Sequence, residues 1–161
     1  MEPYLAFLVN TFGYMGILFV GVLSSVSIFL PSPAFVFIVA ISATRLFDPF
    51  LVGFFAGLGA ALGELTSYAV AFGGTKLASR KYNVDKRIRE VHKYFESYGD
   101  EVIIFLFAIS PLPFDIIGLF CGLVKYPIRK FFVLTLAGKL VKYWIIAYSG
   151  YYGFEMILSV I

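Results

Sequence analysis

SPLPFDIIGLFCG, residues Ser110–Gly122, decides how the chain can fold. Its two prolines, Pro111 and Pro113, each remove a backbone donor and disfavour the α region for the preceding residue. Eight apolar residues, 102–109, precede the pair, and eleven residues with one charge, 114–124, follow it. As helices these arms would reach about 12 and 16 Å, roughly half of a hydrocarbon core of about 30 Å. We interpret the segment as a re-entrant hairpin that turns near mid-depth, with one kinked spanning helix as the alternative.

The composition indicates an integral membrane protein of one domain. Of the 161 residues, 60% are hydrophobic and 14% are charged, whereas soluble domains carry about 25% charged residues. No charge occurs between Glu2 and Arg45, a run too long for a soluble core helix. The absence of a basic n-region argues against a secretory leader. The single Cys121 excludes an internal disulfide. The net charge is +3, and the distribution of the basic residues indicates contact with lipid head groups rather than with nucleic acid.

The chain, residues 1–161, divides into five segments. A spanning helix is expected over residues 3–22, and a hairpin plus a spanning helix over residues 24–75. Residues 76–101 hold seven basic and five acidic residues on an amphipathic pattern, which is typical of a helix in the head-group plane. A second hairpin and helix follow over 102–150. The tail, 151–161, is too short to span and is expected to extend the last helix.

The two halves of the chain repeat the same features. Each has a Pro-x-Pro turn, an apolar arm and a spanning helix, the helices being expected over residues 50–74 and 131–150. One helix contains GELTSY, residues 63–68, and the other GKLVKY, residues 138–143. Because each half crosses the membrane once, a linker on one face gives the halves opposite orientations. The predicted fold is an all-α inverted repeat of re-entrant hairpin plus transmembrane helix. The turn prolines are Pro31, Pro33, Pro111 and Pro113.

Basic residues predict the orientation. With the linker in the cytoplasm, ten Lys and Arg residues lie inside and only Arg45 lies outside. The positive-inside rule favours this arrangement, which makes the N-terminus cytoplasmic. The linker residues expected to contact lipid head groups are Lys86, Arg87, Arg89 and Lys93.

These features together resemble the DedA/VTT-domain (SNARE-associated Golgi protein) family, and are similar to its small prokaryotic YqaA-like branch. The resemblance covers roughly residues 24–150 and rests on the paired hairpins, the amphipathic linker, GELTSY, SPLPFDIIGLFCGL and AGKLVKY. It implies a plasma-membrane protein of a prokaryote that scrambles phospholipids or flips polyprenyl-phosphate lipids, with proton coupling in some bacterial members. It implies no cofactor and leaves a homo-oligomer open.

Ionisable residues at the expected membrane depth are the candidates for a transport site. Each costs roughly 2.5–3.5 kcal/mol at the centre of a lone helix, so such residues normally face a cavity or a partner. Asp115 and Glu64 are interpreted as a transport or proton site. The alternative for Asp115 is a carboxylate that braces the turn, and for Glu64 an ion pair with Lys139 across the pseudo-two-fold axis.

Lys139 and Lys142 are three residues apart, on one helical face, where they could hold a lipid phosphate. Ser32 and Ser110 offer hydroxyls to a head group at the two turns, although capping of a broken helix explains them equally well.

The sequence contains none of the catalytic motifs that we considered, so we do not expect an enzyme. One histidine excludes H-E-x-x-H metal chemistry, and neither G-x-S-x-G nor a phosphate-binding glycine–lysine loop occurs. The first hypothesis is therefore a lipid transporter. The alternatives are a transporter or channel for a small ion or solute through a closed pore, and a scaffold that transports nothing.

Overall fold

The computed structural model describes residues 12–26, 33–79 and 99–158, which contain helices and no strand. The helices are α2 (Tyr14–Val26), α3 (Pro33–Ala43), α4 (Pro49–Ser79), α6 (Asp100–Ile109), α7 (Asp115–Leu123) and α8 (Ile128–Leu158). The predicted all-α class is confirmed over this part of the chain.

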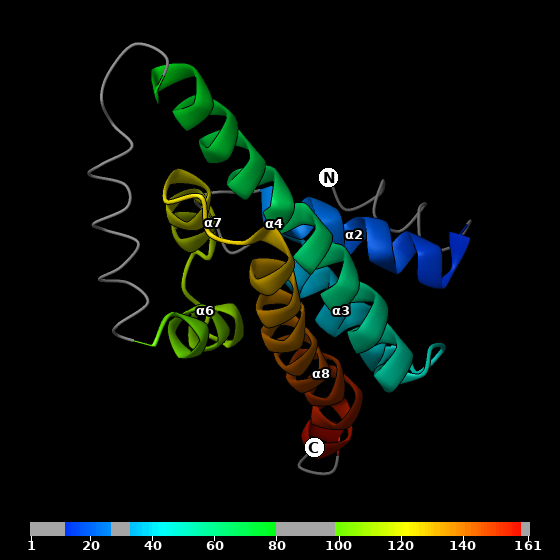
Figure 1. Ribbon diagram of the computed structural model, residues 1–161. Coiled ribbons are helices and arrows are strands. Elements are labelled where there is room, and N and C mark those ends of the chain that lie inside the picture. The colour runs from blue at the N-terminus through cyan, green and yellow to red at the C-terminus, as the bar shows by residue number, and fades with distance from the viewer. Residues whose placement is uncertain (1–11, 27–32, 80–98, 159–161) are drawn as a thin grey trace.

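The two longest helices, α4 and α8, cross at the centre of the molecule and run antiparallel (Figure 1). Gly53 meets Trp144 and Gly57 meets Leu140, so residue numbers fall along α8 as they rise along α4. A Cβ at position 57 would lie 3.1 Å from the Leu140 Cα, so glycine is what allows this close approach.

Both central helices are long and apolar enough to cross a membrane, over residues 49–74 and 128–153. These spans agree with the helices expected over residues 50–74 and 131–150. Helix α8 continues to Leu158, so the described part of the tail, residues 151–158, extends the last helix, as expected.

The Pro-x-Pro segment breaks the chain between α6 and α7, as predicted. Ser110 leaves α6 with an extended backbone (φ −63°, ψ 159°), which a following proline favours. Lys130, near the start of α8, forms an ion pair with Glu101, near the start of α6, with 2.6 Å between Nζ and Oε1. A single kinked helix over residues 102–124 would instead separate its ends by roughly 30 Å. Helices α6 and α7 therefore form a helical hairpin.

Residues 3–11 of the helix expected over residues 3–22 lie outside the described residues, and the remaining part differs from that expectation. Gly13 has a left-handed backbone (φ +55°) that interrupts it, and α2 then continues past residue 22 to Val26. Ser24 and Ser25, expected to follow the helix, lie inside it. Their hydroxyls donate to carbonyl oxygens at 2.6 and 2.8 Å, which satisfies them within the helical region. Helix α2 therefore ends at Val26, four residues beyond the expected end at residue 22.

Helices α2 and α3 also return to the end where they begin. The amide of Asp48, just before α4, donates to the Tyr14 hydroxyl at the start of α2 (3.1 Å). The Tyr14 and Phe47 rings pack edge to face with centroids 5.3 Å apart. This is the opposite end from Lys130, because Trp144 Nε1, in the second half of α8, donates to the carbonyl of Phe50 at the start of α4 (3.1 Å).

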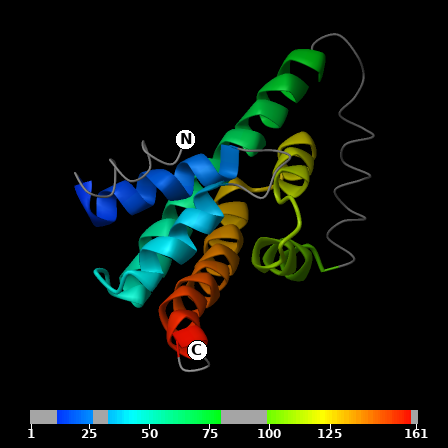
Figure 2. The same cartoon turned by 180° about the vertical axis from the view of Figure 1, so that it is seen from behind.

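Each central helix packs against one short helix from its own half of the chain and one from the other half. Within the halves α2 packs on α4 and α6 packs on α8; between the halves α3 packs on α8 and α7 packs on α4. Seen from behind, the α2–α3 and α6–α7 pairs lie on opposite flanks of the central helices (Figure 2). Arg45 after α3 and Lys125 after α7 both have left-handed backbones, with φ of 59° and 55°. The same turn thus precedes each central helix.

Buried apolar side chains form two clusters, one for each hairpin. The first joins α2 and α3 to the first half of α4 and the second half of α8. The second joins α6 and α7 to the remaining halves. The clusters meet where the two central helices cross, between Ala60 and Tyr68 on α4 and between Phe131 and Tyr143 on α8.

Some of the expected features lie outside the described residues. Of the segment 76–101, only the ends are described: α4 continues to Ser79, and Gly99 (φ +80°) directly precedes α6. Pro33 is the first residue of α3. The expected site residues that fall outside the described ranges are Pro31, Ser32, Lys86, Arg87, Arg89 and Lys93.

Candidate functional site

A polar layer separates the two apolar clusters. Its members are Glu64 and Ser67 on α4, Asp115 on α7, and Lys139 and Lys142 on α8. About 22 Å of α4 precedes Glu64 and about 16 Å of α8 precedes Lys139, so the layer lies near the middle of both central helices. Glu64, Asp115 and Lys139 are only 2%, 6% and 6% exposed.

Glu64 and Lys139 form a buried ion pair. Lys139 Nζ lies 2.6 Å from Glu64 Oε1, and it also lies over the Phe114 ring, 5.0 Å from the centroid. The two residues occupy the same position of the repeated motif, so the ion pair joins the halves where the central helices cross. The sequence left this pair open as the alternative role of Glu64, and the structure contains it. Glu64 Oε2 has no hydrogen-bond partner among the described residues.

Asp115, the first residue of α7, is bound by α4. The Ser67 hydroxyl donates to Asp115 Oδ1 at 2.6 Å. The two residues meet because α7 approaches α4 closely at Gly118, where a Cβ would lie 3.1 Å from the Ser67 Cβ. Sequence reasoning did not single out Ser67. The signal was there, because Ser67 in GELTSY occupies the position of Lys142 in GKLVKY.

Lys142 is half-buried and binds the turn of the second hairpin. Its Nζ donates to the backbone carbonyl of Ser110 at 2.9 Å. The Ser110 hydroxyl donates to the Phe107 carbonyl at 2.9 Å and accepts from the Leu112 amide at 3.3 Å, which is the capping role that the sequence left open. Lys139 and Lys142 therefore have different partners, one a carboxylate and the other a backbone carbonyl.

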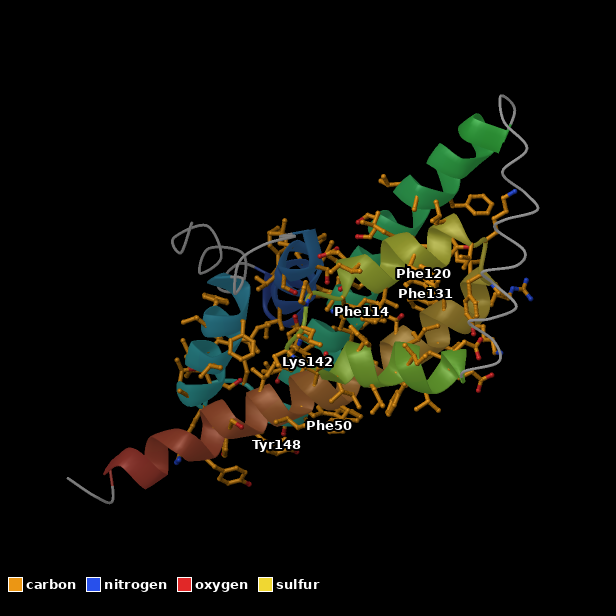
Figure 3. All side chains as sticks on the ribbon, turned by 90° about the vertical axis from the view of Figure 1, so that its left-hand side faces the viewer. Phe50, Phe114, Phe120, Phe131, Lys142 and Tyr148 are labelled. Carbon is orange, nitrogen blue, oxygen red and sulfur yellow. The ribbon has the colours of Figure 1, made fainter. Side chains whose placement is uncertain are left out.

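The turn of the second hairpin lies beside the middle part of α8. Ala108, one turn before the break, packs against Gly138 of α8, and Ser110 binds Lys142. These contacts place the turn about 15–21 Å along α8 from its first residue, roughly half of a hydrocarbon core. In Figure 3, Lys142 and Phe114 lie between Tyr148 and Phe131 along the molecule. Pro111, Leu112 and Pro113 are nevertheless exposed at the surface.

The tyrosine of each repeated motif connects its helix to another segment. The Tyr68 hydroxyl donates to the Tyr126 carbonyl at 2.6 Å, in the turn before α8. The hydroxyls of Tyr143 and Ser24 lie 2.7 Å apart, which ties α8 to the end of α2. Sequence reasoning missed both roles, although the motifs share the tyrosine. Together with the polar layer, these bonds hold both hairpins against the helix crossing.

The charges of the polar layer sum to zero, but only one carboxylate and one ammonium group form an ion pair. Two carboxylates and two ammonium groups are present, and one of each is neutralised in the Glu64–Lys139 pair. Where the structure describes the chain, no carboxylate lies within ion-pair distance of Lys142. Lys142 is thus the ammonium that an incoming anion can reach without breaking an ion pair.

Comparison with known proteins identifies the family. The family model of the VTT domain matches residues 30–152, a range that contains every member of the polar layer. An uncharacterized protein of Methanocaldococcus jannaschii is 27% identical over 143 residues, which cover 88% of this chain and 86% of that protein. No solved structure matches the chain. As the resemblance predicted, this chain belongs to the VTT domain family of membrane proteins.

Proposed function

We propose that this protein moves lipids across the membrane, as a phospholipid scramblase or as a flippase for polyprenyl-phosphate lipids. In this proposal the α2–α3 and α6–α7 hairpins are re-entrant and enter from opposite faces, as an inverted repeat. Support comes from the ends of the hairpins, which lie at opposite ends of the α4–α8 pair. The apolar barrier would then be thinnest where the hairpin turns approach the helix crossing.

The observation that carries the proposal is the polar layer beside an exposed turn near the middle of α8. Lys142 and Asp115 flank the segment Pro111–Pro113, which is open at the surface. A head group could therefore follow the polar residues while its tails stay in the bilayer, and an enclosed pore would not need this opening. The Lys142 ammonium would bind a lipid phosphate as a point charge. Asp115 and Glu64 are the groups that would exchange protons if transport is linked to them.

The same proposal sets the orientation. The amphipathic linker lies on the cytoplasmic face of the plasma membrane, and the N-terminus is cytoplasmic. Each basic residue near an anionic lipid surface contributes about 1 kcal/mol, so Lys86, Arg87, Arg89 and Lys93 together would hold this end at the head groups.

A reconstituted translocation assay tests the proposal. The purified protein is placed in vesicles that contain a phospholipid or a polyprenyl phosphate with a fluorescent head group, and an impermeant reductant destroys the label outside. Without transport only the outer-leaflet label is lost, and with transport the inner label follows. Lys142→Met should slow this loss, whereas Arg129→Met, which removes an exposed cation from the same helix, should not.

The rival functions give different results in the same vesicles. Folded protein that moves neither lipid would overturn the proposal. Passage of a small ion or solute without lipid movement would indicate a closed pore, and no passage of any kind would indicate a scaffold.

A further inference from the structure

The second hairpin is held at its turn by two different contacts. On the α7 side, Asp115 accepts a hydrogen bond from Ser67 of α4. On the α6 side, the Ser110 carbonyl accepts one from Lys142 of α8. Both bonds are charge-assisted: the first has a carboxylate acceptor that is 6% exposed, and the second has a half-buried ammonium donor. Hydrogen bonds in which either partner is ionised are roughly twice as strong as bonds between neutral groups.

The contact between Lys142 and Ser110 can be exchanged at low cost. An ammonium carries three donors, and a phosphate oxygen is a stronger acceptor for them than a peptide carbonyl. Lys139 is not equivalent, because Glu64 neutralises it at 2.6 Å and its side chain is 7% exposed. An anion at mid-depth would therefore take Lys142 from Ser110 and leave the buried pair intact.

Apart from the packing of Ala108 on Gly138, the described residues give the Ser110 end of the turn no further hydrogen bond to α8. Pro111 and Pro113 have no N–H to donate, and the Ser110 hydroxyl is used within its own segment, on Phe107 and Leu112. Pro111, Leu112 and Pro113 are all exposed. Loss of the Lys142 contact would free the Ser110 end of the turn, while Asp115 stays attached to α4 through Ser67.

We propose that Lys142 is a latch, which holds the Ser110 end of the second hairpin turn in the resting protein and releases it when an anionic phosphate head group binds the ammonium. This inference rests on the proposed function, because it assumes that a lipid head group reaches the polar layer. It adds a coupling between head-group binding and movement of the hairpin turn. Binding of the phosphate to Lys142 thereby releases the turn beside which the head group passes.

Distances between two spin labels test the latch without a transport measurement. Labels are attached at Leu112→Cys in the turn and at Leu46→Cys in the turn before α4, in a Cys121→Ser background; the two leucines are 53% and 79% exposed. The protein is held in maltoside micelles, which contain no phosphate. We expect a narrow distance distribution that broadens or shifts when phosphatidic acid is added and stays unchanged with diacylglycerol, which has the same tails.

Variants separate a latch from a general effect of lipid. Lys142→Met puts an apolar side chain of similar length in place of the lysine and breaks no ion pair. It should give the broad distribution without lipid and should not respond to phosphatidic acid. Arg129→Met is the matched control and should behave as the parent does. A narrow, lipid-insensitive distribution in folded Lys142→Met protein would overturn the latch, as would an equal response to diacylglycerol.

The remaining outcomes separate failure of the latch from failure of the proposed function. A response to inorganic phosphate alone would overturn a lipid as the source of the anion. If phosphatidic acid moves the turn but vesicles show no translocation, the latch stands and the proposed function fails. If vesicles translocate lipid while the distance stays fixed, the proposed function stands and the latch fails.

Discussion

Two ion pairs in this protein have the same length but opposite surroundings. The N–O distance is 2.6 Å in both Lys139–Glu64 and Lys130–Glu101. The side chains of the first pair are 7% and 3% exposed, and those of the second are 45% and 55% exposed. Glu64→Gln leaves an ammonium buried without a counter-charge, so it should lower the free energy of unfolding by about 3–5 kcal/mol. Glu101→Gln breaks a solvent-screened pair and should cost about 0–1 kcal/mol.

A double-mutant cycle isolates the buried pair. Lys139→Met alone should be as destabilising as Glu64→Gln, because it leaves the carboxylate unpaired. The double variant Glu64→Gln/Lys139→Met buries no charge, and it should be more stable than either single variant. Since the two positions are equivalent in the repeat, the exchanged pair Glu64→Lys/Lys139→Glu should also fold. Unfolding is measured in mixed micelles through Trp144, the one tryptophan of the chain.

Two results would refute this reasoning. The first is an equal, small loss of stability for Glu64→Gln and Glu101→Gln, which would show that burial does not set the strength of the pair. The second is additivity in the cycle, which would show that Glu64 and Lys139 do not interact.

Three further predictions follow from contacts of the second hairpin with α4. Gly122→Ala should destabilise the protein by about 1–3 kcal/mol, because the added Cβ would overlap the Tyr68 carbonyl oxygen, whereas Gly74→Ala meets open space and should be neutral or stabilising; thermal unfolding in detergent compares them. Tyr68→Phe removes the bond to the Tyr126 carbonyl and should lower the free energy of unfolding by about 0.5–1.5 kcal/mol in the same measurement. A larger loss of stability for Tyr68→Phe than for Gly122→Ala would contradict this prediction. Asp115→Asn keeps an oxygen that can accept from Ser67, so it should fold but translocate lipid slowly and without pH dependence; wild-type rates between about pH 5 and 8 would remove Asp115 from the mechanism.

The helices and the hairpin turn could be predicted because their causes are local. Proline acts on its own residue and the one before it, and the break between α6 and α7 lies at Pro111 and Pro113. A run of apolar residues long enough to span identifies α4 and α8 without any tertiary information. The expected end of the first helix at residue 22 was too early, because a serine ends a helix only when its hydroxyl competes with the backbone. Here Ser24 and Ser25 bond to carbonyl oxygens and leave the helix intact.

The contacts of the polar layer depend on tertiary register, which motifs reveal only in part. The repeated motif suggested Glu64 with Lys139, because equivalent positions meet where two related helices cross. It could not show that Lys142 binds a backbone carbonyl, because a carbonyl has no signature in the sequence. Ser67 was missed for a related reason: its role requires that α7 pack on α4, and this contact depends on the close approach at Gly118.

The most direct test of the account is the side of the membrane from which each end of the two hairpins can be labelled. Single cysteines at Glu101, Lys125 and Leu46 are placed in a Cys121→Ser background in intact cells, and an impermeant thiol reagent is added outside, then again after permeabilisation. If both hairpins are re-entrant and the linker is cytoplasmic, Leu46→Cys reacts from outside, and Glu101→Cys and Lys125→Cys both react only after permeabilisation. Labelling of Glu101→Cys and Lys125→Cys from opposite faces would contradict the re-entrant hairpin and, with it, the inverted repeat.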